Sequence, residues 1–320
     1  MRLLAAVFRL ALIIAFCHSC CSVSRNCFIG ISTGPPSKVA LILSSFSTHV
    51  SPLGSVFVLL TTRAAEHEVY FSHLVGRIEF VGIDFSDADV PMIAMKRFDA
   101  YLNFLLHTEN GKACSNVMYT DTYDVFFQGD PFDPRQYSDV LTFSVETKRI
   151  GDDIWNAQWV YNCYGLETLL LLHNQTIANA GVTLGPYSSI VAYTQHLLDE
   201  FDSRSFFDRW HPGLDGNGLF RYGGFVSSDS THSCWTDQGF LNYLLHVRYS
   251  QSDIAFTAPS NFENIVFTVG HNLPDADFRW HDGTLLRHRS GGRSDVPAVV
   301  HQLNRFKDHW ALALDLYAVR

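Results

Sequence analysis

Charge is sparse in this sequence, and positive charge never gathers in it. Asp, Glu, Lys and Arg make up 17% of its 320 residues, the formal net charge is −9, and no run of Lys and Arg occurs. Binding a phosphate backbone needs clustered positive charge, so nucleic acid is not an expected partner. Disorder is not expected either, because 47% of the residues are hydrophobic, which is enough for a sizeable core.

Internal repeats, low-complexity tracts and separating linkers are also missing. We therefore expect one domain over residues 39–320, preceded by a Gly-, Pro- and Ser-rich entry segment at 25–38. The four cysteines of residues 25–320 show no CxxC spacing, so a zinc site is not expected. In an oxidising compartment they can form two disulfides, with three alternative pairings. These cysteines are Cys27, Cys114, Cys163 and Cys234.

The first 24 residues indicate the secretory pathway. Arg2 and Arg9 flank apolar residues, and the uninterrupted run that follows is shorter than the about 20 residues of a membrane-spanning helix. A secretory signal peptide fits this pattern, with a short Golgi-type signal anchor as the alternative. We expect the body of the protein in the Golgi lumen or secreted, with membrane attachment only through this segment. Asn174 lies in a single Asn-x-Thr glycosylation sequon.

Short apolar runs alternate with amphipathic stretches along the first half of the chain. We predict strands at 39–46, 68–73 and 77–85, and a helix over 92–106 with an apolar stripe at Met95, Phe98, Leu102 and Leu105. Residues 51–67 suit either a helix or a strand, and we favour a helix because a strand follows at 68–73. Farther on, residues 177–201 are typical of a strand, a Gly-bearing turn and an amphipathic helix, and a helix begins within 235–247. Strands alternating with helices predict an α/β fold with a mainly parallel sheet flanked by helices.

Two carboxylates, Asp121 and Asp124, end the hydrophobic strand that begins at Val117. In α/β sheets, ligands bind at the carboxyl ends of strands. Carboxylates suit Mn²⁺ or Mg²⁺, with or without an imidazole such as that of His301. Such an ion holds a diphosphate and neutralises its charge as a leaving group. Alone, the two acids would more often cap a turn, and His301 would more often be a structural histidine.

Several sequence blocks, taken in order, resemble those of GT-A fold glycosyltransferases, in the nucleotide-diphospho-sugar transferase group. Glycogenin-like and plant arabinosyl- and xylosyltransferase-like enzymes are the distant relatives. The blocks are RFDAYLNFLL (97–106), YTDTYDVFFQGDPF (119–132), IANAGVTLG (177–185), DQGFLNYLL (237–245) and VVHQLNRF (299–306). Together they span most of residues 39 to 310. One departure is the spacing D-T-Y-D in place of D-x-D, which makes Asp124 the firmer metal ligand and leaves Asp121 to the metal or the donor's ribose.

The resemblance implies a GT-A, Rossmann-like domain that transfers a hexosyl or pentosyl group from a nucleotide-diphosphate donor. UDP-sugars are the commonest donors of the relatives, a glycan or protein hydroxyl is the acceptor, and most relatives retain the anomeric configuration. The ion, Mn²⁺ or Mg²⁺, would be held by Asp121, Asp124 and His301.

Further roles follow from the same resemblance. Arg97 would approach the nucleotide or orient the acids, and Glu146 would contact the acceptor or the sugar. Asp237 and Gln238 would face the transferred sugar as catalytic residues, although Asp237 also suits a helix N-cap. The sugar pocket would be lined by Asn179, Ala180 and Gly181. Because Gly181 has no Cβ, it would let the backbone approach a ligand closely, although it also suits a simple turn.

Three other functions compete with transfer. A degenerate protein of the same fold would bind a sugar or a partner without transferring, as the altered D-T-Y-D spacing suggests. A phosphohydrolase also starts from an acid at a strand end, but the chain has no DxDxT sequence. A disulfide-stabilised structural protein is disfavoured, because 7 cysteines in 320 residues are few.

Overall fold

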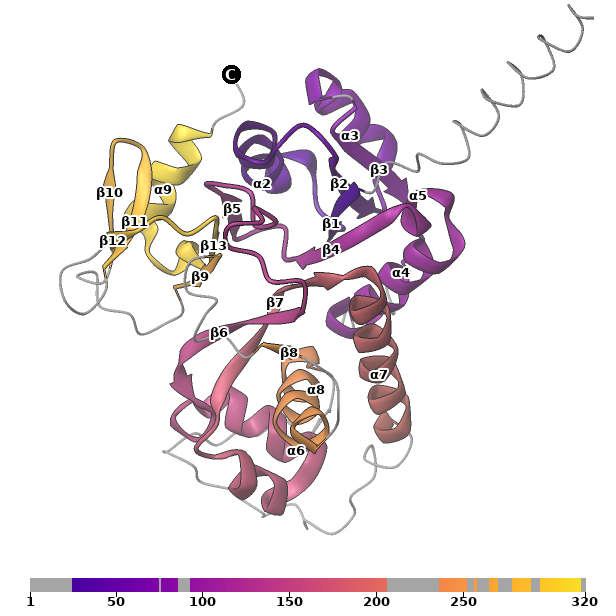
Figure 1. Cartoon of the computed structure of the whole chain (residues 1–320), viewed down its shortest axis with the longest axis vertical. Helices are drawn as coiled ribbons and strands as arrows, with labels where there is room; N and C mark the ends of the chain where they lie inside the picture. The colour runs from indigo at the N-terminus through magenta and orange to yellow at the C-terminus, as the bar shows by residue number, and fades with distance from the viewer. Residues whose placement is uncertain are drawn as a thin grey trace, which may run out of the picture.

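The computed structural model describes residues 25–74, 76–85, 93–205, 236–251, 256–257, 265–269, 278–288 and 294–317. These residues form a mixed α/β structure in which the strands of the largest sheet cross the middle of the molecule (Figure 1). The order in this sheet is β3-β2-β1-β4-β7-β6-β8. Its strands are β1 (Arg25–Ser32), β2 (Ser55–Thr61), β3 (Ile78–Gly82), β4 (Cys114–Thr120), β6 (Leu141–Arg149), β7 (Thr176–Pro186) and β8 (Phe256–Thr257).

The sheet is mainly parallel, as expected. β3, β2, β1 and β4 run parallel, whereas β7 runs antiparallel to both β4 and β6. Eight helices are described. They are α2 (Pro36–His49), α3 (Ala64–Tyr70), α4 (Ile93–His107), α5 (Glu109–Lys112), α6 (Ile154–Leu172), α7 (Tyr187–Ser205), α8 (Asp237–Tyr243) and α9 (Lys307–Leu316). In Figure 1, α6, α7 and α8 gather in the lower half of the molecule, below α2 and α3.

Both faces of the sheet are buried. On β1, Cys27 and Ile29 pack into a core with residues of α4, α7 and α8, while Phe28 packs into a second core with residues of α2. Strands that are covered on both faces carry continuous apolar runs, as β2 does in SVFVLLT.

Two smaller sheets complete the fold. One has the order β5-β13-β9, and the other has the order β10-β11-β12. The strands of the first are β5 (Val125–Phe127), β9 (Val266–Thr268) and β13 (Val299–His301), and those of the second are β10 (Phe278–His281), β11 (Thr284–His288) and β12 (Ser294–Asp295).

Several predictions for the first 73 residues are wrong. Residues 39–46 lie in α2 rather than in a strand. This helix is apolar on more than one side, because Ile42 and Phe46 face the large sheet while Leu41 packs in the core of the β5-β13-β9 sheet. A helix that is buried on two sides loses the polar stripe by which a surface helix is identified.

The same reasoning corrects the neighbouring segments. Residues 51–67 contain β2 before α3 begins, and residues 68–73 continue α3 into a short 3₁₀ turn rather than a strand. The segment 25–38 is not an entry segment, because it supplies β1 at the centre of the sheet.

Other predictions are confirmed. The strand within 77–85 is β3, the helix of 92–106 is α4, and residues 177–201 form β7 and α7. The Gly-bearing turn predicted between the last two is absent from this described segment, because β7 continues through Gly181 and Gly185 and α7 follows it directly. On α4, Met95, Phe98 and Leu105 are buried as expected, but Tyr101 and Phe104 complete the buried face in place of Leu102.

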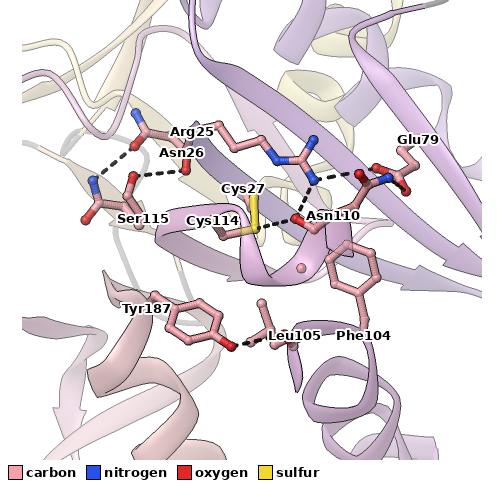
Figure 2. Close-up of a disulfide and its surroundings, with 12 residues drawn as sticks. Arg25, Asn26, Cys27, Glu79, Phe104, Leu105, Asn110, Cys114, Ser115 and Tyr187 are labelled. Atoms are coloured by element: carbon pink, nitrogen blue, oxygen red, sulfur yellow. Dashed lines mark hydrogen bonds and ion pairs between the residues drawn. A yellow bond between two sulfur atoms is a disulfide. The ribbon is translucent and has the colours of Figure 1, made fainter. Parts of the chain in front are cut away.

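A disulfide joins the beginnings of two central strands. Cys27 of β1 is bonded to Cys114 of β4, with 5.7 Å between their Cα atoms and a sequence separation of 87. Figure 2 shows the Arg25 side chain beside this bond, directed at the Asn110 carbonyl, to which it donates a hydrogen bond. The same guanidinium lies 3.9 Å from a carboxylate oxygen of Glu79. The observed bond therefore belongs to one of the three alternative pairings of the four cysteines. Cys163 is also disulfide-bonded, and Cys234 lies outside the described residues.

The proposed signal segment, residues 1–24, also lies outside the described residues. Among the helices that are described, none is both long and apolar enough to cross a membrane.

Candidate metal centre

Three predicted metal ligands meet where the large sheet and the β5-β13-β9 sheet join. Asp121 directly follows β4, Asp124 directly precedes β5, and His301 is the last residue of β13, paired with Val125 across the strands. Nε2 of His301 lies 3.5 Å from Oδ2 of Asp121 and 3.7 Å from Oδ1 of Asp124. One ligand atom from each residue lies within 4.8 Å of the others. Ligands about 2 to 2.5 Å from a shared ion have separations of this size, so the group can hold a metal ion.

The burial and hydrogen bonding of the His301 imidazole are typical of a metal ligand. Its side chain is fully buried, and Nε2 has no hydrogen-bond partner among the described residues. Its other nitrogen, Nδ1, lies 3.5 Å from the hydroxyl of Thr268, and Thr268 is itself buried on β9. Orientation of a histidine through its second nitrogen is the usual arrangement around metal ligands. An unpaired buried nitrogen facing two carboxylates therefore fits a divalent cation.

The two residues between the acids fasten the loop to the end of β1. The Thr122 hydroxyl donates to the Ile31 carbonyl at 2.7 Å, and the side chain of Thr122 is buried. The Tyr123 hydroxyl lies 3.1 Å from the Ser32 hydroxyl and accepts from the Gly34 amide at 3.1 Å. The D-T-Y-D spacing is therefore occupied by two anchoring residues, and both acids still reach His301.

β7 bends beside the three ligands. Its pairing with β6 jumps from Thr183 opposite Phe143 to Asn179 opposite Ser144, so residues 180–182 have no partner on β6. On its other edge, β7 stays attached to β4, because the Asp121 amide donates to the Gly181 carbonyl at 2.7 Å. Bulges of this kind often aim residues at functional sites.

Gly181 allows the backbone to pass close to the ligands. A Cβ at this position would lie 2.3 Å from Cε1 of His301 and 2.7 Å from Oδ2 of Asp121. Any side chain here would therefore displace the ligands. The prediction assigned Gly181 to a close backbone approach to the sugar, but in the structure the close neighbours are His301 and Asp121.

Arg97 lies between two acids. From α4, its guanidinium forms ion pairs with Asp121 and with Asp237, the first residue of α8, and it donates to the Ala180 carbonyl at 3.1 Å. Asp237 has both oxygens engaged, since Oδ1 accepts from the Gln238 amide at 2.8 Å. Arg97 therefore orients Asp121, which was one of its two predicted roles.

The acids differ in their proton affinity. Burial opposes the ionisation of Asp121, but Arg97 and His301 outweigh burial and hold its pKa well below the usual range. Burial raises the pKa of Asp124, and the nearby charge of Asp121 adds to that rise. For His301, burial opposes protonation, but Asp124 and Asp121 outweigh it and raise the pKa. Without an ion, the imidazolium thus neutralises part of the negative charge.

A second group of polar side chains continues from the ligands into the region of β6, β7 and α8. Oε1 of Glu146 accepts from Nδ2 of Asn179 at 2.8 Å and from Nε2 of Gln238 at 3.2 Å. Oδ1 of Asn179 accepts from the Gly181 amide at 2.8 Å, which connects this group to the ligands. Gln238 also donates to Oδ1 of Asn156 at 2.9 Å.

The structure thus brings the predicted site residues into one connected network. They are Arg97, Asp121, Asp124, Glu146, Asn179, Ala180, Gly181, Asp237, Gln238 and His301. Ala180 takes part through its backbone, whose amide donates to Oε1 of Gln238 at 3.4 Å.

Sequence reasoning missed several supporting residues. Asn242 exchanges hydrogen bonds with both backbone groups of Ala178 and so fastens α8 to β7. Its spacing four residues after Gln238 was a usable signal, because such residues share a helix face. Thr268 and Asn156 lie in segments with no recognisable motif.

Comparison with known proteins adds no assignment. No protein-family model matches the chain, and no curated protein is detectably similar to it. The case for a function therefore depends on the arrangement of these side chains.

Proposed function

We propose that this protein is a metal-dependent glycosyltransferase of the GT-A fold. It moves a sugar from a nucleotide-diphosphate donor, with UDP-sugars as the first choice, to a hydroxyl of a glycan or protein in the secretory pathway. The observation that carries the proposal is the convergence of Asp121, Asp124 and His301 at the end of β4. In α/β sheets this is the region where nucleotides bind.

The side chains of the site suit three tasks, which are binding the metal ion, orienting Asp121 and binding the sugar. Asp121, Asp124 and His301 would hold Mn²⁺ or Mg²⁺, and the ion would supply positive charge to the departing diphosphate. Arg97 keeps Asp121 ionised and in place. The acid and amide side chains of Glu146 and Gln238 are joined by a hydrogen bond and suit the hydroxyls of a sugar.

The mixed sheet supports this proposal in a second way. β4 lies next to β1 in the sheet, and the Tyr123 hydroxyl joins the loop of the two acids to Ser32 and Gly34 at the carboxyl end of β1. A donor that binds along this edge would have its diphosphate at the acids and its nucleoside over the ends of the parallel strands. The sugar would then point toward Glu146 and Gln238.

The test is release of nucleoside diphosphate from a panel of nucleotide sugars, with Mn²⁺ or with EDTA. We expect release from one donor, lost with EDTA and at least 100-fold slower in Asp124→Asn and His301→Ala. Matched controls are Asp282→Asn and His281→Ala, which change exposed residues of the β10-β11 turn and should retain activity. If no donor is cleaved but UDP still binds with Mn²⁺, the protein is a degenerate binding protein instead. If neither occurs, the UDP-dependent proposal fails.

A further inference from the structure

Glu146 differs from the other acids of the network in its partners. Asp121 and Asp237 are paired with Arg97, and Asp124 lies beside His301. Within the described part of the chain, Glu146 forms no ion pair. It is held by two amide N–H groups, from Asn179 and Gln238, and both bind the same oxygen, Oε1.

The second oxygen of Glu146 is therefore available. No described residue donates a hydrogen bond to Oε2, while the two amides fix the orientation of the carboxylate. The residue is half-buried. A carboxylate that is held in one orientation and free on one side suits a developing positive charge.

Asp237, by contrast, is not available for this task. Both of its oxygens are engaged, one by Arg97 and one by the amide of Gln238, and it is only 7% exposed. Its contacts favour a positioning role, in which it holds Arg97 against Asp121. This reverses the order expected from the resemblance, which placed Asp237 first among the acids that face the sugar.

We propose that Glu146 is a catalytic residue whose free oxygen faces the transferred sugar, an inference that rests on the proposed function. When the bond between the anomeric carbon and the diphosphate oxygen breaks, the electron pair leaves with the diphosphate and the sugar carbon becomes positive. Glu146 balances that charge while the acceptor oxygen forms its bond to the same carbon. The acceptor's proton goes to an oxygen of the departing diphosphate.

The variant Glu146→Gln tests this role, because its side-chain carbonyl can still accept from Asn179 and Gln238. We expect kcat to fall about 100- to 1,000-fold, with donor KM and Mn²⁺-dependent UDP affinity within about threefold of wild type. Glu79→Gln is the control, since Glu79 is an acid on β3 that pairs with Arg25 away from the site.

The kinetics of Glu146→Gln and of the wild type separate the inference about Glu146 from the proposed function. Unchanged kcat in Glu146→Gln overturns the inference while the proposed function stands. A joint loss of kcat and UDP affinity also overturns it, because that pattern indicates structural support of Asn179 and Gln238 alone. Wild-type protein that cleaves no donor overturns the proposed function and this inference together.

A separate observation concerns the turn between α6 and β7. Asn174 and Thr176 of the sequon are both exposed, and the last turn of α6 next to them exposes Leu170 and Leu171 at 65% and 64%. The Cys27–Cys114 disulfide is typical of an oxidising compartment, where sequons meet the glycosylation machinery. We infer that Asn174 carries an N-linked glycan, which shields these leucines from solvent.

In this modification, Nδ2 of Asn174 loses a proton and bonds to the anomeric carbon of an oligosaccharide, whose lipid-diphosphate carrier leaves with the electron pair. The full chain produced in a eukaryotic secretory host should lose mass on treatment with an N-glycan amidase. Asn174→Gln and Thr176→Ala should abolish this shift, whereas Thr176→Ser should keep it. A secreted wild-type protein with no shift overturns the inference.

Discussion

Gly181 provides the sharpest perturbation of the candidate metal centre. In Gly181→Ala, the new Cβ would lie 2.3 Å from Cε1 and 2.5 Å from Nε2 of His301. Ordinary contacts of a Cβ begin at 3.4 Å, so the ring must retreat by about 1.1 Å, the difference between 3.4 and 2.3. His301 has little room to retreat, because it is fully buried between β5 and β9.

The size of the effect follows from this displacement. Metal–ligand distances tolerate changes of about 0.2 Å, so a shift of about 1 Å removes His301 from the coordination shell. We expect the affinity for Mn²⁺ to fall about 100-fold, or about 2.8 kcal/mol. Crowding should lower the free energy of unfolding by about 1–3 kcal/mol, which leaves the protein folded.

Titration with Mn²⁺, followed by calorimetry or by the electron paramagnetic resonance of free Mn²⁺, measures this loss. Gly129→Ala is the matched control, because its Cβ would meet Ala298 at 3.6 Å, an ordinary contact. Equal Mn²⁺ affinity in wild type, Gly181→Ala and Gly129→Ala would refute the assignment of the ion to His301 and its neighbours.

Three further perturbations test other parts of the structure. Replacing Cys27 and Cys114 by Ala should lower the free energy of unfolding in urea by about 2–5 kcal/mol, because their bond closes a long loop; no change would contradict the bond. Arg97→Met should lower it by about 3–5 kcal/mol at pH 7, since Asp237 is left buried without its cation; a neutral effect would exclude this pairing. Mn²⁺ affinity should weaken by up to about tenfold per pH unit below the raised pKa of His301, because the ion must displace its proton; a flat profile between pH 5.5 and 7.5 would argue against His301 as a ligand.

The site was more predictable from the sequence than the fold around it. Asp121, Asp124 and His301 were identified as metal ligands through the sequence blocks that resemble those of glycosyltransferases. Alone, the two acids would more often cap a turn and His301 would more often be a structural histidine. The structure brings the three together although Asp124 and His301 lie 177 positions apart in the sequence. Their convergence needs the pairing of β13 with β5, which local patterns do not reveal.

The errors in the fold have a physical cause. α2 packs against two sheets at once, so its sequence has neither the stripe of a surface helix nor the alternation of a strand. β2 is covered on both faces and shows a similar continuous apolar run. Periodicity cannot separate two such segments, and the tertiary contacts decide between helix and strand.

The bend in β7 could not be predicted either. The segment from Asn179 to Val182 contains a glycine, which suggested a turn or a close approach of the backbone to a ligand. The sequence did not show that His301 and Asp121 would be the residues beside it. Only the pairing shows that β7 leaves β6 while remaining bonded to β4. Thr122 and Tyr123 were likewise read as a departure in spacing, whereas their hydroxyls anchor the loop to β1.

The central claim is that Asp121, Asp124 and His301 share one divalent ion at the diphosphate of a nucleotide. Crystals of the protein grown with Mn²⁺ and UDP, measured at the manganese absorption edge, test this directly through the anomalous signal. We predict one strong peak about 2 to 2.5 Å from Nε2 of His301 and from a carboxylate oxygen of each acid, with the diphosphate in contact. A Mn²⁺ peak elsewhere, or a bound diphosphate with no metal among these three side chains, would contradict the claim.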